Sequence, residues 1–197
     1  MTPTGAVAEK SAIRRQSVID TAIDLYLTHG FAGTTMDMIA QASGVARRTI
    51  FRDFPTKEDI VLAWTVTTGP ALVARIDPAR CATDPVTAAT EAVLGHIEAH
   101  RDVHPISLKV GRLIEDTPSL KARAHEKYQV WEDMVATAIV AHGGDPLAAA
   151  MAAAIAIGGL RIAARQWTLE GGERSMIDLT AATYAALPRP IVSKDQT

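Results

Sequence analysis

Three places along the chain combine a helix-capping residue with proline, and this pattern constrains the fold more than any other. At 84–85, 117–118 and 145–146, an aspartate or threonine is followed directly by proline. Aspartate and threonine cap the free amides at a helix N-terminus, and proline suits the first helical position, where no N–H is needed. The pairs predict long helices over about 85–104, 118–142 and 146–170.

Helical spacing continues through the rest of the chain. Ile19, Ala22, Ile23 and Tyr26 recur at i, i+3, i+4 and i+7, which is one face of a helix over about 11–29. Further helices are expected over about 34–43, 46–54, 105–115 and 173–187, with one from 56 that Gly69 and Pro70 break. No segment has a convincing strand pattern. The expected fold is therefore all-α, with about nine helices.

Two threonine–aspartate pairs have the spacing of a capping box, in which two side chains satisfy each other's backbone amides. Thr34 stands three residues before Asp37, and Thr56 stands three residues before Asp59. Gly44 allows a tight turn between the two short helices that follow the first pair. The segment 34–53 is thus predicted to be a helix-turn-helix.

Composition indicates a soluble, globular protein, since 48% of the 197 residues are apolar and 21% are charged. The net charge is −2, but residues 1–57 carry seven Lys or Arg against five Asp or Glu, so the N-terminal part is mildly basic. A single cysteine excludes an intrachain disulfide and fits a reducing cytoplasm. The longest apolar run, 147–160, is shorter than the roughly 20 residues of a membrane helix. We expect a cytoplasmic protein without a membrane segment.

The segment 30–59 reads GFAGTTMDMIAQASGVARRTIFRDFPTKED. Over roughly 11–65 it resembles the DNA-binding domain of the tetracycline-repressor (TetR) family. The resemblance is carried by Gly30-Phe31, Thr34-Thr35, Ile39-Ala40, Gly44-Val45, Thr49, Phe54-Pro55 and Lys57-Glu58. It implies a DNA-binding head at 11–65 and a helical body at 66–188 that binds a small effector and forms a homodimer. The tails, 1–9 and 189–197, are expected to be flexible.

Arginines crowd the start of the second short helix, where they oppose the helix dipole and add nothing to helix stability. In a major groove, arginine can bind guanine or phosphate; the alternative is that these are merely solvated charges. The resemblance implies phosphate contacts by Thr35, Phe51 and Lys57, and base or backbone contacts by Arg47, Arg48, Thr49 and Arg52. Lys10, Arg14 and Arg15 could add phosphate contacts. Ala46, Ser43 and Phe51 depart from the family's usual serine, alanine and tyrosine.

The segment 148–164 is apolar on all sides, and a single chain of this size can hardly cover such a helix. Together with 173–187 it is expected to form a two-fold interface in a homodimer. The alternative is a core helix within one chain. The candidate interface residues are Ala148, Met151, Ala152, Ile155, Gly159, Ile162, Met176 and Leu179.

Aromatic residues are scarce, and Trp64, Tyr128, Trp131 and Trp167 lie in the body, with Met134 one helical turn on from Trp131. They could line an apolar effector pocket, although ordinary core packing is the alternative. The leading hypothesis is a repressor that such an effector releases from a palindromic operator. No cofactor or metal is expected.

Two other classes of function remain open. His96, His100 and His104 share one helical face and suggest a helical metal-dependent enzyme or sensor, but no HExxH, GxSxG or P-loop motif accompanies them. We expect solvated or pocket-lining histidines and no enzyme. A dimeric scaffold that no longer binds DNA is the third hypothesis.

Overall fold

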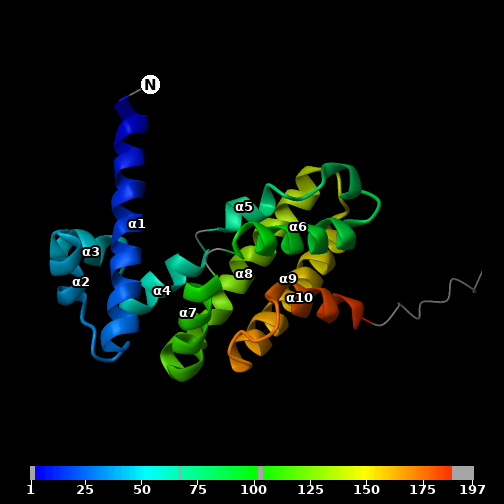
Figure 1. Ribbon diagram of the computed structural model, residues 1–197. Helices are drawn as coiled ribbons and strands as arrows, with labels where there is room; N and C mark the ends of the chain where they lie inside the picture. Colours follow the sequence, from blue (N-terminus) through cyan, green and yellow to red (C-terminus); the bar gives the residue numbers. More distant parts are fainter. Residues whose placement is uncertain (1–2, 67, 102–103, 188–197) are drawn as a thin grey trace, which may run out of the picture.

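The computed structural model describes residues 3–66, 68–101 and 104–187, and over these residues it contains ten α-helices, one 3-10 turn and no strands (Figure 1). This confirms the all-α fold. The helices are α1 (Pro3–His29), α2 (Met36–Ser43), α3 (Arg47–Asp53), α4 (Lys57–Val66), α5 (Gly69–Val73), α6 (Pro85–Ala99), α7 (His104–Asp116), α8 (Pro118–Ala141), α9 (Pro146–Leu169) and α10 (Met176–Ala185), with the 3-10 turn at Pro78–Arg80. There is one helix more than the nine expected, because the predicted fourth helix is interrupted before Gly69 and continues as the separate helix α5.

Two of the three predicted caps that precede a proline are present. Asp84 accepts a hydrogen bond from the Thr87 amide, and Asp145 accepts one from the Ala148 amide. Thr117 makes no side-chain cap bond, although α8 begins after it. Helix α6 ends at Ala99 rather than near 104.

The Thr56–Asp59 capping box is confirmed, because Asp59 accepts from the Thr56 amide at 2.8 Å and the Asp59 amide donates back to the Thr56 hydroxyl at 3.3 Å. The Thr34–Asp37 box was wrong by one residue. Thr35 is the N-cap of α2, and Thr34 instead donates to the carbonyls of Leu25 and Gly30, at 3.2 and 2.9 Å. Backbone acceptors at the end of α1 thus compete successfully for the first threonine hydroxyl.

The prediction of a flexible N-terminal tail over 1–9 was wrong from residue 3 onward, because α1 begins at Pro3. Proline at the first position and the helix-favouring Ala6, Ala8 and Glu9 allow the helix to start early. In Figure 1, α1 extends well past the short helices α2 and α3 that pack beside it. Residues 1–2 and the predicted tail 189–197 lie outside the described residues.

Two apolar cores hold the chain together. The first lies within α1–α4 and includes Tyr26, Ile39 and Phe54, but Val110 of α7 and Leu120 of α8 complete it. We call α1–α4 the head and the remaining helices the body. The second core surrounds α9, which packs against α6, α8 and α10. The head therefore rests on the body through shared apolar contacts.

Helix α9 is the helix among the described residues that is long and apolar enough to cross a membrane, with a mean hydropathy of 1.9. A core helix of a globular protein has the same composition. Ala152, Ala156 and Ile157 of α9 are completely buried among neighbouring helices. The burial identifies α9 as a core helix.

The structure corrects half of the predicted dimer interface. Ala152, Gly159, Met176 and Leu179 are buried inside the single chain, so they are not open to a partner. The reason is that α9 is apolar on two sides, and spacing alone does not tell which side faces α6, α8 and α10. The outer side keeps Met151 and Ile162 exposed, at 55% and 56%, with Ala148 and Ile155 partly exposed beside them.

Gly159 allows the closest contact between α9 and α10. A Cβ atom there would lie 2.8 Å from Cδ1 of Tyr184, whose hydroxyl donates to the Ala156 carbonyl at 2.7 Å. We expect Gly159→Ala to lower the free energy of unfolding by about 1–3 kcal/mol, since the ring is held in place. Gly95→Ala on α6 is the matched control. Its Cβ meets only Arg75 at 3.6 Å, so stability should rise by up to about 1 kcal/mol. Denaturant unfolding measures both; equal effects would contradict the packing argument.

Candidate functional site

The first candidate site is the outer surface of α3. Ile50 and Phe54 anchor the helix in the head core, and Gly44 makes the turn before it with a left-handed φ of 66°. Ala46 stands at the N-cap and provides no side-chain bond, so the expected loss of a cap is confirmed. The inward residues leave the opposite side of α3 to solvent.

The exposed side of α3 is basic. Arg47 pairs with Asp37 at 2.9 Å and lies 5.4 Å from the centre of the Phe51 ring, while Arg52 pairs with Asp53 at 2.9 Å. Arg48 is exposed and has no ion-pair partner among the described residues. Phe51 is 40% exposed, a large area for an aromatic ring. The Arg47–Asp37 pair is exposed on both sides and therefore cheap to exchange for another anion, whereas the Asp53 side chain of the second pair is only 19% exposed.

Two further predicted contacts have structural roles. The Thr35 hydroxyl accepts from the Met38 amide at 3.2 Å, which leaves its own hydrogen free to donate. The Lys57 ammonium donates to the carbonyls of Phe31 and Thr34, at 2.6 and 3.3 Å, and lies 4.2 Å from the Phe31 ring centre. No local pattern predicts that Lys57 holds the loop between α1 and α2. One of its three N–H groups remains for another acceptor.

The N-terminal cations are also partly engaged. Arg15 lies over the Phe54 ring at 4.5 Å, and Arg14 approaches Asp53 at 3.6 Å. Lys10 is exposed. Asp53 thus receives Arg14 and Arg52 together, and a side-chain hydrogen bond from Arg52 is the largest cause of its lowered pKa.

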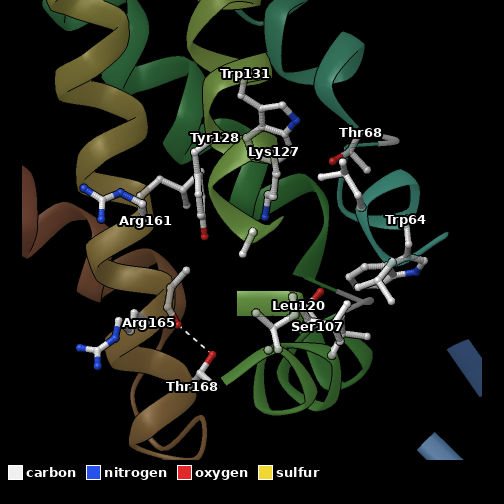
Figure 2. A pocket seen from close by; sticks show the side chains of 18 of the residues that line it. Trp64, Thr68, Ser107, Leu120, Lys127, Tyr128, Trp131, Arg161, Arg165 and Thr168 are labelled. Atoms are coloured by element: carbon white, nitrogen blue, oxygen red, sulfur yellow. Dashed lines mark hydrogen bonds between the residues drawn. The ribbon is translucent and has the colours of Figure 1, made fainter. Parts of the chain in front are cut away.

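The second candidate site is a cavity of about 620 Å³ between the head and the body (Figure 2). Its walls come from α1, α4, α6, α7, α8 and α9, with Met176 from α10. Trp64, Tyr128, Trp131 and Trp167 line it, as predicted. Met134 does not, because its side chain packs on Gly69 of α5; a Cβ on that glycine would lie 3.1 Å from the Met134 sulfur.

Polar groups gather at one part of the cavity wall. The Thr68 hydroxyl oxygen lies 3.1 Å from Nε2 of His96, and the centres of the His96 and His100 rings are 4.2 Å apart. Nδ1 of His100 donates to the His96 carbonyl at 2.8 Å. Burial, then the nearby positive charges, lowers the pKa of His96 to about 4, so this ring is neutral at pH 7.

His96 and His100 thus line the cavity, as expected for pocket-lining histidines. No group of three or more possible ligands is close enough to hold a metal among the described residues. The side chain of His104 lies outside them. Sequence spacing missed the other polar groups of the wall, namely Thr68, Ser107, Lys127 and Thr168, because they come from different helices.

Helix α4 connects the two sites. Asp59 caps α4 through Thr56 and also accepts a hydrogen bond at 2.6 Å from Arg123 of α8. Burial by itself raises the pKa of Asp59, but the Thr56 and Arg123 hydrogen bonds lower it overall. Glu58 and Arg123, on either side of this junction, line the cavity. The cavity wall and the first turn of α4 therefore share this junction.

The comparisons with known proteins agree with this arrangement. The family model described as bacterial regulatory proteins, tetR family, matches residues 18–64, and the model of the MftR C-terminal domain matches residues 83–191. The chain belongs to the tetR family of bacterial regulatory proteins. It is a DNA-binding transcriptional regulator of this family rather than an enzyme.

Relatives support the assignment along nearly the whole chain. It is 30% identical to the transcriptional regulator TcmR of Streptomyces glaucescens, over 93% of this chain and 85% of TcmR. A putative TetR-family regulator from Syntrophomonas wolfei has a similar fold, with a TM-score of 0.66, 16% identity and coverage of 93% and 100%. FadR of Bacillus subtilis, solved with stearoyl-CoA, has a TM-score of 0.57 and 15% identity, over 86% and 95%. At these identities the structures show the fold alone.

Arg48 and Lys57 should respond differently to substitution. We expect Arg48→Ala to weaken binding to a selected operator about tenfold or more, with no change in melting temperature, because the side chain is free in the protein. Lys57→Met should lower the free energy of unfolding by about 1–3 kcal/mol, since two carbonyls lose a charged donor. Fluorescence anisotropy and thermal unfolding measure the two effects. Full operator affinity in Arg48→Ala would remove that residue from the DNA surface.

Proposed function

We propose that the protein is a homodimeric repressor whose operator binding is opposed by a small, largely apolar effector in the cavity. The head, residues 11–65, would bind DNA, and the body, residues 66–188, would bind the effector and form the dimer. Regulation of transcription places the protein with the DNA, in the cytoplasm. The observation that carries the proposal is the Asp59 junction, where the capped end of α4 meets the cavity wall.

The exposed side of α3 suits the major groove. Arg47, Arg48 and Arg52 supply forked donors for guanine or phosphate, and Thr49 lies among them. Thr35, Phe51 and Lys57 are positioned around this helix for contacts with the phosphate backbone. Arg47 would exchange the exposed Asp37 carboxylate for a phosphate when DNA binds, so little stability is lost.

The outer side of α9 suits a second copy of the chain. Leu147, Met151, Ile162 and Leu169 are each more than half exposed along this one helix, and partly exposed Ile155 lies between them. An apolar stripe of this kind on a folded protein marks an interaction surface. A two-fold axis beside α9 and α10 would hold two α3 helices about one DNA turn apart, roughly 34–36 Å.

An effector can act at a distance only by binding the arrangement that does not fit DNA more tightly than the one that does. The cavity is mostly apolar and its volume is ordinary for a small-molecule site. All three tryptophans of the chain line it, so their fluorescence reports occupancy. The neighbour FadR was solved with stearoyl-CoA, and we include acyl-CoAs among the compounds to be tested.

The dimer surface is tested by charge. Ile162→Asp should give a folded monomer, because a dimer would bury an unpaired carboxylate at a cost of several kcal/mol, while a monomer leaves it in water. Ala152→Arg should instead prevent folding, since Ala152 is buried in one chain. Val130→Asp, on an exposed part of α8, is the control that keeps the dimer. Light scattering after size exclusion gives the mass; an unchanged dimer of Ile162→Asp would place the interface elsewhere.

The switch is tested by reciprocity. Operator fragments are first selected from genomic DNA; failure to select any would favour the scaffold without DNA binding. Fatty acids, acyl-CoAs and aromatic compounds are then titrated with and without operator, and each affinity must change by the same factor in both directions. Asp59→Asn weakens the charged contact with Arg123, so we expect a smaller factor with similar effector binding. A ligand with equal affinity in both cases would leave a binding site but no switch.

A further inference from the structure

Lys127 of α8 brings a charged ammonium group next to the aromatic rings of the cavity wall. Its ammonium points into the open space between α8, α9 and the helices below (Figure 2). It lies 4.9 Å from the Tyr128 ring centre and 4.8 Å from that of Trp131. Within the described chain, no carboxylate forms an ion pair with it. The two rings replace part of the hydration that the ammonium loses, but no anion of the described chain neutralises its charge.

Two of the other cations around the cavity are already paired with carboxylates. Lys121 contacts Glu115 at 2.7 Å, and Arg123 contacts Asp59 at 2.6 Å. In Figure 2, Arg161 and Arg165 lie along the α9 side of the cavity with their guanidinium ends turned away from its centre. Lys127 thus provides the positive charge inside the cavity, and the Tyr128 hydroxyl points into the same space without a hydrogen bond to another described residue.

We propose that the cavity takes a small carboxylate on an apolar body, with the carboxylate paired to Lys127 and the apolar part against Trp64, Val110 and Leu160. This inference rests on the proposed effector role of the cavity and adds the chemical class of the effector. Ion pairing would restore the solvation that the buried ammonium lacks, and the Tyr128 hydroxyl can donate to the second oxygen. The body of the acid can be a straight chain or a flat ring system, since the aromatic and aliphatic walls suit either.

Acid and alcohol pairs test this charge directly. The neutral dye N-phenyl-1-naphthylamine reports occupancy, and it is displaced by decanoic acid or 1-decanol, and by 1-naphthoic acid or 1-naphthalenemethanol. An apolar cavity without a cation prefers the uncharged alcohol, because a carboxylate loses more hydration. We expect the acid to bind at least tenfold more tightly than its alcohol, which is about 1.4 kcal/mol. The first pair represents fatty acids and the second aromatic acids, so the stronger pair identifies the body.

Substitution then assigns the preference to one residue. Lys127→Met should abolish the acid preference, keep dye binding, and raise the melting temperature because a desolvated charge is removed. Arg161→Met, a cation on the α9 side of the same cavity, should keep the preference. Equal weakening of acid and alcohol by Lys127→Met, or a lower melting temperature, would give Lys127 a structural role and overturn the inference.

The pH dependence provides an independent test. Burial lowers the pKa of Lys127 to about 8, so acid affinity should change little between pH 7 and 8 and fall up to tenfold per unit above pH 8. The other ionisable groups that line the cavity are Asp20 on α1, Glu58 on α4, His96 and His100 on α6, Glu115 on α7, Lys121, Arg123, His125 and Tyr128 on α8, and Arg161 and Arg165 on α9. Burial holds the pKa of His96 near 4 and raises that of Tyr128 to about 12, so neither ring changes charge between pH 7 and 9. Acid affinity that stays flat to pH 9 would contradict pairing with Lys127.

The two proposals fail separately. If the dye binds but acids and alcohols bind alike, the carboxylate inference is wrong and the apolar effector site stands. If acids bind through Lys127 but leave operator affinity unchanged, the cavity is an anion site and the proposed switch is wrong. If neither dye nor acids bind the wild-type dimer, both proposals are wrong.

Discussion

The head of this protein is too small to close its own apolar core, and the other features of the molecule depend on that constraint. Helices α1–α4 bury Tyr26, Ile39 and Phe54, but Val110 and Leu120 from the body complete the cluster. Small domains bury a low fraction of their surface and gain correspondingly little stability. The position of the head is therefore tied to α7 and α8, which are also walls of the cavity. The DNA-binding head and the cavity therefore share side-chain contacts, because the head depends on the body for its stability.

Hydrogen bonds at the same junction join specific residues of the head and the body. Asp59 joins the first turn of α4 to Arg123 of α8, and the Tyr26 hydroxyl donates to the Lys57 carbonyl at 3.1 Å. Lys57 in turn holds the loop before α2 through the carbonyls of Phe31 and Thr34. These contacts form a continuous path from α8 through α4 to the loop before α2. Coupling of this kind needs two arrangements of one element that both sites favour differently.

Charge is distributed unevenly between surface and cavity. On α3, the arginines are exposed, and the Arg47–Asp37 pair exchanges readily with solvent anions. Inside the cavity, Lys127 has no carboxylate partner among the described residues. The near-neutral net charge of the chain conceals both facts, since it sums a basic head and an acidic body. Local position, and not net charge, decides which cations can bind a ligand.

Local chemistry in the sequence was enough for the helices and for the family. Asp84, Asp145 and the Thr56–Asp59 pair cap helices as their spacing indicates, because a cap depends on atoms only three residues apart. The order Gly44, Ile50 and Phe54 likewise determines the turn and the buried side of α3. The sequence therefore established an all-α regulator with a helix-turn-helix head.

The choice of faces and partners depended on the tertiary structure. Spacing showed that α9 is apolar all round, but only the packing of α6, α8 and α10 decided that Ala152 is core and Ile162 is surface. Met134 and Lys127 lie close together on α8, yet the first packs on α5 and the second points into the cavity. Lys57 was expected to contact a DNA phosphate, but its ammonium donates to two carbonyls of the loop before α2, which lie 26 and 23 residues earlier in the chain. Such contacts join distant parts of the chain, and no local pattern encodes which distant group arrives.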